Sequence, residues 1–179
     1  RMGRRVGEVV GGRLARSLLE LGGNNAIIIM DDADLDMVIR GTLFGAVGTA
    51  GQRCTSTRRL LCHESIVDEV TSGLLKAYEQ VQIGDPLETS TLMGPLINEY
   101  AIDDMRSALK QATDEGCEIL CGGLEGIDRW ADRPGNFVEP TIVKVPIGSQ
   151  PEVTKEETFA PILYIFTIKD LDEALALHN

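Results

Sequence analysis

The sequence predicts a mostly parallel, three-layer α/β domain, and three observations support this prediction. Two short runs, Ala26–Met30 and Ile162–Ile168, are apolar almost throughout, which is typical of strands that are buried on both faces. Residues 99–115 place apolar side chains at helical spacing, which predicts an amphipathic helix. Strands and helices alternate along the chain, and this alternation favours a parallel sheet covered by helices on both faces.

The first third of the chain begins with a predicted helix over residues 3–19, in which glycine recurs every four residues. The short apolar run Leu18–Leu21 then predicts a strand that ends at the turn-forming pair Gly22-Gly23. After the strand Ala26–Met30, aspartates over residues 31–36 favour a helix start, because negative charge stabilises the positive end of the helix dipole. We expect that helix to run to about Thr49.

The remaining elements follow in order. A strand is expected at Arg58–Cys62, and the pattern S-x-x-D from Ser65 to Asp68 predicts a capping box for a helix that ends near Gln82. After the helix over 99–115, we expect a strand at Ile119–Cys121, a polar loop at Gly122–Asn136, a strand at Phe137–Val145, the strand Ile162–Ile168 and a helix over Asp170–His178.

Composition excludes several classes of function. Lys and Arg number 17 against 28 Asp and Glu, so the net charge is −11, which argues against nucleic-acid and anionic-membrane surfaces. No apolar run approaches the ~20 residues that cross a bilayer, and no secretory signal opens the chain. A cytoplasmic location is therefore expected. Both ends fall within helical patterns, so we expect the chain to be a fragment of a longer protein.

Cysteine spacing predicts reduced thiols and no metal site. The four cysteines stand at positions 54, 62, 117 and 121, and none forms a C-x-x-C pair. The two histidines, His63 and His178, do not stand at a spacing typical of zinc ligands. Thiols in a protein without a secretory signal are expected to stay reduced.

Cys54 is the candidate nucleophile because its neighbours are polar. It follows Gly51, Gln52 and Arg53 in a glycine-rich turn, whereas the other three cysteines are better explained by packing. An adjacent cation such as Arg53 favours the thiolate over the thiol. When a thiolate attacks a carbonyl it creates an oxyanion, which backbone N–H groups at the cysteine could stabilise.

Glu20 is the candidate general base. It interrupts the apolar run Leu18–Leu21, and a carboxylate buried in such a run is costly unless it is paired or functional. A carboxylate beside an acylated cysteine could activate the water that releases the acyl group. The alternative is that Glu20 is an edge residue that faces water.

Three segments resemble the signature segments of the NAD(P)-dependent aldehyde dehydrogenase superfamily. They are Leu18-Leu19-Glu20-Leu21-Gly22-Gly23-Asn24-Asn25, Gly51-Gln52-Arg53-Cys54 and Glu156-Glu157-Thr158-Phe159-Ala160-Pro161. The resemblance covers essentially the whole chain and implies an aldehyde dehydrogenase catalytic domain. Asparagine after Gly-Gly, Thr49–Cys54 and Phe159–Tyr164 are similar to the antiquitin branch. That branch oxidises α-aminoadipate semialdehyde, which implies this aldehyde as the small-molecule substrate.

The resemblance implies a covalent mechanism. Cys54 would attack the aldehyde to form a thiohemiacetal, loss of hydride to the nicotinamide would give a thioester, and Glu20 would activate the water that hydrolyses it. Arg53 would help to hold an anionic substrate.

The same resemblance implies four residues at the cofactor, which would be NAD, with NADP not excluded. Glu157 would hold the hydroxyls of the nicotinamide-side ribose, and Phe159 would pack near the nicotinamide. Leu21 lies where the family backbone approaches that ring. Arg1-Met2-Gly3 is similar to the end of the family loop under the pyrophosphate, which makes Gly3 a candidate.

The resemblance also implies two truncated domains. Residues 1–22 would be the C-terminal end of a cofactor-binding domain, and residues 23–179 most of a catalytic domain. Because most of the cofactor domain would lie upstream, we expect no NAD-dependent turnover from the isolated chain. The longer protein is expected to be a homo-oligomer, either a dimer or a tetramer.

Two other functions stay open. An acylating relative would pass the thioester to coenzyme A, but such enzymes usually lack the base that Glu20 supplies. A non-catalytic module that retained the fold is the second alternative, and the presence of Cys54, Glu20 and Glu157 together counts against it.

Overall fold

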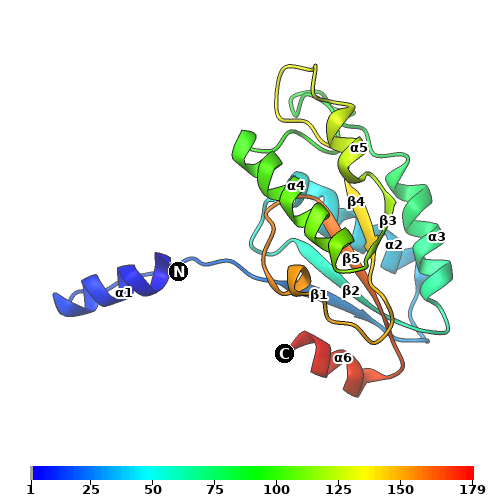
Figure 1. Ribbon diagram of the computed structural model, residues 1–179, viewed down its shortest axis with the longest axis horizontal. Coiled ribbons are helices and arrows are strands. Elements are labelled where there is room, and N and C mark those ends of the chain that lie inside the picture. Colours follow the sequence, from blue (N-terminus) through cyan, green and yellow to red (C-terminus); the bar gives the residue numbers. More distant parts are fainter. Residues whose placement is uncertain (1) are drawn as a thin grey trace.

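The computed structural model describes residues 2–179 and contains a five-stranded sheet in the order β1-β2-β5-β4-β3. The strands are β1 (Asn25–Ile29), β2 (Thr57–His63), β3 (Glu118–Cys121), β4 (Thr141–Lys144) and β5 (Ile162–Ile168). Neighbouring strands are parallel except β3, which pairs with β4 in the antiparallel sense. The prediction of a mostly parallel sheet is confirmed (Figure 1).

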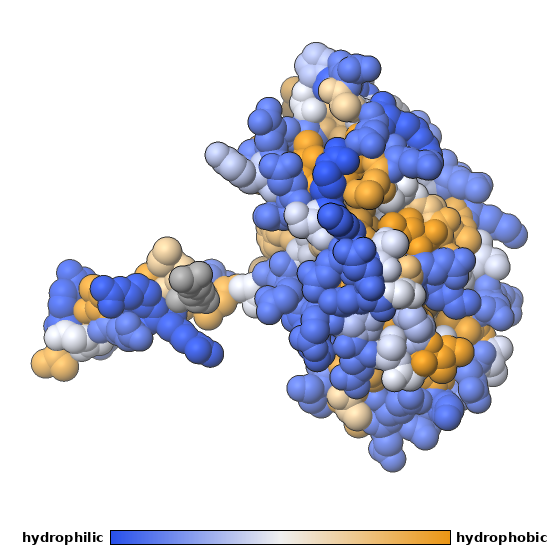
Figure 2. All heavy atoms as spheres, in the orientation of Figure 1, coloured by the Kyte–Doolittle hydropathy of each residue, from blue (hydrophilic) through white to orange (hydrophobic). Residues whose placement is uncertain are grey.

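The N-terminal helix α1 (Met2–Gly12) lies apart from the sheet (Figure 1), at the end of an irregular segment over residues 13–24. Met2 and Val9 of this helix are exposed. Figure 2 shows apolar residues on the surface of the helix. The helix predicted over 3–19 is wrong beyond Gly12, because the chain turns at Leu14, whose φ is 54°. The strand predicted at Leu18–Leu21 is also wrong, since no described strand lies beside it to accept its backbone hydrogen bonds.

The other helices are α2 (Leu35–Val47), α3 (Val67–Tyr78), α4 (Glu99–Asp114), α5 (Gly123–Asp128) and α6 (Leu171–His178), with short 3₁₀ turns η1 (Gly48–Gly51) and η2 (Glu152–Lys155). Asp34 caps α2 by accepting a hydrogen bond from the Met37 amide, and Asn98 and Asp170 cap α4 and α6 in the same way. The helix starts expected at these three positions are confirmed.

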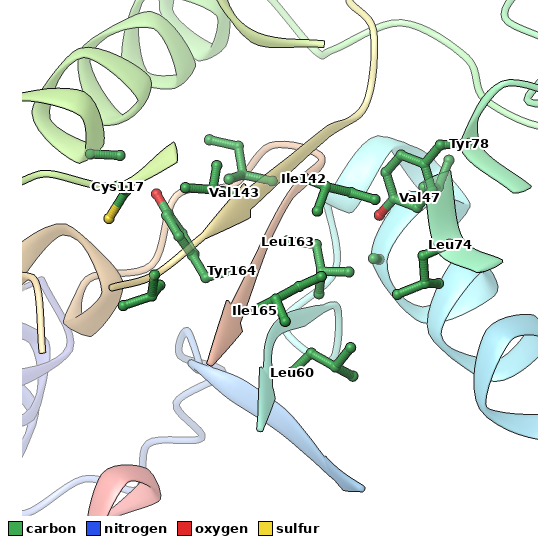
Figure 3. Packing of buried hydrophobic residues seen from close by; sticks show 14 of the residues in the cluster. Val47, Leu60, Leu74, Tyr78, Cys117, Ile142, Val143, Leu163, Tyr164 and Ile165 are labelled. Atoms are coloured by element: carbon green, nitrogen blue, oxygen red, sulfur yellow. The ribbon is translucent and has the colours of Figure 1, made fainter. Parts of the chain in front are cut away.

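Helices cover both faces of the sheet, as expected for a three-layer fold. Leu163 and Ile165 of β5 point to the side of Leu74 in α3, whereas Tyr164 points to the side of Cys117, which follows α4 (Figure 3). The side chains of Leu163 and Ile165 are almost completely buried. Because β5 is buried on both faces, it needs the continuous apolar run that its sequence supplies.

Two local predictions are wrong. Ser65 does not cap α3, because its hydroxyl pairs with Nδ1 of His63 at 2.8 Å and Ile66 occupies the cap position. The segment expected to be a polar loop contains helix α5, which begins after Gly122 with φ of 73°. Helix α5 has only six residues, which is too short for a helical spacing of apolar side chains to be recognised in the sequence.

A strained backbone precedes the candidate cysteine. Thr49, Ala50 and Gly51 have φ values of 59°, 52° and 68°, all in the left-handed region. Non-glycine residues there cost about 1 kcal/mol or more each, so the surrounding packing must hold them. A β-carbon at Gly51 would collide with the carbonyl group of Ala160 and the nitrogen of Pro161. Glycine at this position therefore lets the cysteine turn approach the segment before β5.

We expect Gly51→Ala to lower the free energy of unfolding of the 179-residue chain by about 2 kcal/mol or more, because it adds a steric collision to an unfavourable φ. Urea denaturation followed by circular dichroism measures this. The matched control is Gly41→Ala in α2, where a β-carbon has nothing within 4 Å. The control should gain about 0.5–1 kcal/mol. Equal stability of Gly51→Ala and the unchanged chain would contradict the packing described.

Candidate active site

The candidate site lies at the amino ends of three adjacent parallel strands. Residues 22–24 precede β1, residues 48–56 precede β2, and residues 157–161 precede β5, while the sheet order places β1, β2 and β5 next to one another. Because parallel strands start at the same edge of a sheet, the three segments meet there. The topology thus gathers segments that lie far apart in the chain, as the close approach of the Glu157 carboxylate to Gly22 shows.

Arg58, the second residue of β2, connects these segments. Its side chain is only 4% exposed, although it carries a charge. Nη1 donates to the Gly51 carbonyl at 3.2 Å, Nη2 donates to the Arg53 carbonyl at 3.1 Å, and Nε donates to the Gly23 carbonyl at 3.4 Å. One guanidinium therefore joins the cysteine turn to the Gly22-Gly23 turn.

The same guanidinium holds the third segment. Nη2 of Arg58 pairs with Oε1 of Glu157 at 2.8 Å, and Nη1 donates to the Thr158 carbonyl at 3.0 Å. The Phe159 ring lies 5.4 Å from Cζ of Arg58, which is within range of a cation–π contact. The Glu157 carboxylate also lies so close to Gly22 that a β-carbon there would collide with it.

Cys54 lies on a tight turn with an exposed thiol. The turn closes through a hydrogen bond from the Ser56 amide to the Arg53 carbonyl at 3.0 Å, and the Arg53 amide donates to the Ser56 hydroxyl at 3.1 Å. Nδ2 of Asn25 donates to the Cys54 carbonyl at 2.6 Å and to the Ser56 carbonyl at 3.0 Å. Within residues 2–179 the Cys54 amide has no hydrogen-bond acceptor, so it is free to donate to a ligand.

Two cavities flank Phe159, whose side chain is partly exposed. A cavity of about 530 Å³ is lined by Phe159, Gln52, Thr49 and residues 95–97. Gln52 holds this wall, because its Oε1 accepts from the Ile97 amide at 2.8 Å. A second cavity of about 350 Å³ lies on the side of Phe159 where Glu157 is found. Phe159 therefore lines both a cavity next to the cysteine turn and a cavity next to the carboxylate.

The guanidinium of Arg53 packs against helix α2. Its Cζ lies 5.0 Å from the centre of the Phe44 ring, and Nη2 donates to the Phe44 carbonyl at 3.2 Å. Because Nε of Arg53 is buried without a hydrogen-bond partner in the described chain, the guanidinium is not fully satisfied by the protein. The two contacts with Phe44 hold the Arg53 side chain beside the cysteine turn.

The structure brings Gly3 and Leu21 together but leaves Glu20 in solvent. A β-carbon at Gly3 would lie 2.6 Å from Cδ2 of Leu21, so these two residues pack against each other. Arg1 lies outside the described residues. Glu20 is exposed, and no hydrogen bond or ion pair within residues 2–179 joins it to Cys54. Because the Glu20 carboxylate faces water, it does not carry the desolvation cost expected from the sequence for a carboxylate in a buried apolar strand.

Three residues that shape the site were missed in the sequence, namely Arg58, Asn25 and Gln52. Arg58 and Arg59 stand together at the start of the strand Thr57–His63, and the cost of burying a charge would have marked both arginines as residues that need partners. Asn25 and Gln52 carry no such signal, because an uncharged polar residue beside a turn is common.

Two further classes of site find no support in the part of the chain that the structure describes. No group of three or more His, Cys, Asp or Glu side chains is placed to hold a metal ion. None of the described helices has the length and apolar character needed to cross a bilayer.

The other three thiols differ from Cys54 in their surroundings. Burial raises the pKa of Cys62 to about 11, and burial likewise raises the pKa of Cys117 and of Cys121. Because the thiolate is the nucleophile, a raised pKa lowers the fraction of each thiol that is ionised and reactive at a given pH.

We expect iodoacetamide at pH 8 to label Cys54 in the native chain at least about tenfold faster than any other cysteine, since the other thiols are buried or hold raised pKa values. Peptide mass spectrometry of a time course gives the four rates. In urea, where burial is lost, the four rates should converge. Native labelling of Cys121 as fast as Cys54 would contradict the described site.

The comparisons with known proteins cover the full chain. A model of the Aldehyde dehydrogenase family matches residues 1–179. "Alpha-aminoadipic semialdehyde dehydrogenase" of Bos taurus is 49% identical over 178 residues, which are 99% of this chain and 32% of that protein. "Aldehyde dehydrogenase family 7 member A1" of Brassica napus is 48% identical over 179 residues, which are 100% of this chain and 35% of that protein. The chain spans about a third of the length of these curated relatives.

Solved structures agree. The crystal structure of an E. coli NADP dependent enzyme superposes with a TM-score of 0.90 at 35% identity, covering 99% of this chain and 36% of that one. Betaine aldehyde dehydrogenase of Staphylococcus aureus in complex with NAD+ superposes with a TM-score of 0.88 at 28% identity, covering 99% of this chain and 35% of that one. The family match over all 179 residues shows that this chain belongs to the aldehyde dehydrogenase family.

Proposed function

We propose that this chain supplies the catalytic thiol of a longer NAD(P)-dependent aldehyde dehydrogenase, which oxidises an aldehyde to a carboxylic acid. One observation carries the proposal. The cysteine turn, the Gly22-Gly23 turn and the segment from Glu157 to Phe159 all contact the buried side chain of Arg58. A nucleophile, a fixed carboxylate and an aromatic ring at one edge of the sheet fit this chemistry better than a packing role.

Cys54 is the proposed nucleophile. Its exposed Sγ attacks the aldehyde carbon, forming a carbon–sulfur bond, and the carbonyl electrons move to the oxygen. The free amide of Cys54 is placed on the same residue to donate to that oxyanion. Loss of a hydride from the thiohemiacetal carbon then leaves a thioester on Sγ.

The residues of this chain fit the nicotinamide end of the cofactor. The Arg58 ion pair holds the Glu157 carboxylate in place, and 24% of the Glu157 side chain stays exposed, so the group can accept hydrogen bonds from ribose hydroxyls. The Phe159 ring is exposed beside it and offers an apolar face to a planar ring. Acceptance of the hydride is the chemistry that NAD(P) supplies when bound. Leu21 and Gly3, which pack together, are proposed to lie along the same cofactor.

Glu20 is the proposed base that activates water to hydrolyse the thioester. Its segment, residues 13–24, has no helix or strand, so it can bring the exposed carboxylate to Cys54 once its apolar neighbours are covered. Leu18 and Leu21 are exposed on either side of Glu20. Neighbouring exposed apolar side chains of this kind favour burial against the surface of another domain.

The proposed domain division follows from the same segment. Residues 1–22 would be the C-terminal end of a cofactor-binding domain and residues 23–179 most of the catalytic domain. Helix α1 lies apart from the sheet (Figure 1), and Met2 and Val9 on the helix and Leu14 just after it are exposed, which supports a role in covering a further domain. A dimer or tetramer of the longer protein and a cytoplasmic location stay predictions.

The proposed substrate is α-aminoadipate semialdehyde. The name of the Bos taurus relative supports this choice, since that protein shares 49% identity with the chain. The substrate carries a carboxylate, and the Arg53 guanidinium beside the cysteine turn is the cation proposed to hold it.

We expect the longer protein to oxidise α-aminoadipate semialdehyde in preference to uncharged aldehydes, and Cys54→Ser to lower the turnover number by about a thousandfold or more, because a hydroxyl is a far weaker nucleophile. NADH or NADPH production over an aldehyde panel with both cofactors measures this. Cys62→Ser, at a buried thiol, is the control and should keep the turnover number of its folded fraction. Turnover by Cys54→Ser equal to that of the unchanged protein would refute the proposal.

We expect Glu20→Gln in the longer protein to spare the first turnover but slow the later ones by about a hundredfold, because a lost general base costs about 10²–10⁴. Rapid mixing should show a burst of about one NADH per site followed by a slow phase, with the acyl group on Cys54 visible by mass spectrometry. Glu88→Gln, at another exposed glutamate, is the control. An unchanged steady-state rate would rule out the base role.

A further inference from the structure

We propose that Arg58 is a positioning residue, which aims the Cys54 amide at the oxygen of the bound carbonyl by holding the peptide unit between Arg53 and Cys54. This inference rests on the proposed role of Cys54 as an acyl-accepting nucleophile. In this role Arg58 touches neither the substrate nor the thiol. It acts through a backbone group.

The peptide unit connects the two atoms directly. Nη2 of Arg58 donates to the Arg53 carbonyl at 3.1 Å. That carbonyl and the Cys54 N–H belong to one planar peptide, so fixing the oxygen fixes the direction in which the N–H points. A cation that donates to the carbonyl also polarises the peptide and makes its N–H a stronger donor. The Cys54 N–H is left without an acceptor in the described chain, so this effect is available to a ligand.

The other groups of the cysteine turn are held by uncharged hydrogen bonds that do not involve Arg58. The Asn25 side chain holds the Cys54 and Ser56 carbonyls, and the Ser56 hydroxyl accepts from the Arg53 amide. The Arg53 carbonyl therefore accepts from Arg58 Nη2 and from the Ser56 amide, and only the first of these donors carries a charge. If the guanidinium is removed, the hydrogen bond from the Ser56 amide still closes the turn, but the peptide plane between Arg53 and Cys54 is held less firmly and can rotate.

Arginine is required because of its geometry as well as its charge. A guanidinium has five N–H donors in a rigid plane, and Arg58 has five acceptors, namely the carbonyls of Gly23, Gly51, Arg53 and Thr158 and the carboxylate of Glu157. A lysine keeps the charge but has three donors on a flexible stem. It can pair with Glu157 and still fail to hold the Arg53 carbonyl.

Arg59 offers a matched control on the same strand. It is also buried, and it donates to the Asn24 carbonyl at 2.6 Å and to the Leu177 carbonyl at 3.0 Å. None of its hydrogen bonds reaches the cysteine turn or Glu157. A change at Arg59 thus reports the loss of a buried arginine without loss of the proposed positioning.

Two probes of the Cys54 thiol separate positioning from general damage. With p-nitrophenyl acetate, Sγ attacks the ester carbonyl, an oxyanion forms, p-nitrophenolate leaves, and an acetyl thioester remains while the thiol proton passes to water. With iodoacetamide, Sγ displaces iodide from a saturated carbon and no oxyanion forms. Only the first reaction uses the Cys54 N–H. Both run on the 179-residue chain without cofactor or aldehyde, so they remain informative whether or not the longer protein oxidises aldehydes.

We expect Arg58→Lys to lower the rate constant for p-nitrophenyl acetate at Cys54 by about tenfold or more, while the rate constant for iodoacetamide stays within about twofold. Arg59→Lys should leave the ratio of the two rate constants unchanged. Rates are taken per folded molecule, with the folded fraction measured by circular dichroism and the reaction of Cys54→Ala subtracted. An unchanged ratio in Arg58→Lys, or an equal fall in Arg59→Lys, would overturn the proposal.

A second variant guards against loss of folding. Arg58→Gln removes the charge but is easier to bury than lysine, and it should lower the same ratio in the same direction. If both Arg58 variants unfold under conditions in which Arg59→Lys stays folded, Arg58 acts only in stability and the positioning role is refuted.

Discussion

The buried guanidinium of Arg58 is the point on which the site depends. A charge with a side-chain exposure of 4% is tolerated because one carboxylate and four backbone carbonyls surround it. Loss of Glu157 would leave the buried charge of Arg58 uncompensated, which costs about 3–5 kcal/mol. The three segments that precede β1, β2 and β5 are therefore coupled, since each one supplies part of the same coordination shell.

The site also concentrates strain where the chemistry is proposed. Three successive residues before Cys54 adopt positive φ, and Gly51 presses against the backbone before β5. Sheets of this kind usually bind ligands at the carboxyl ends of their strands, whereas here the segments gather at the amino ends. The cysteine turn projects from that edge with its thiol exposed. Hydrogen bonds from Asn25 and Arg58 hold the turn in place beside the strained backbone of residues 49–51.

Much of the sheet could be predicted, because β1 and β5 are continuous apolar runs that have no other place in a folded domain. The predictions failed where local pattern competes with distant contacts. The run Leu18–Leu21 has the composition of a strand but lacks a neighbour among the described strands, and Ser65 pairs with His63 instead of capping α3. Cys54 was recognisable from its polar glycine turn, and Glu157 and Phe159 only from resemblance to the family.

Patterns along the chain were enough to identify the buried strands, the starts of three helices and the candidate thiol, since each depends on residues within a few positions of one another. The partners of Arg58 depend on folding. Its acceptors stand at positions 23, 51, 53, 157 and 158, and nothing local at Arg58 specifies them. The order of the strands brings those acceptors to one edge, and there a buried cation converts three separate motifs into a single site.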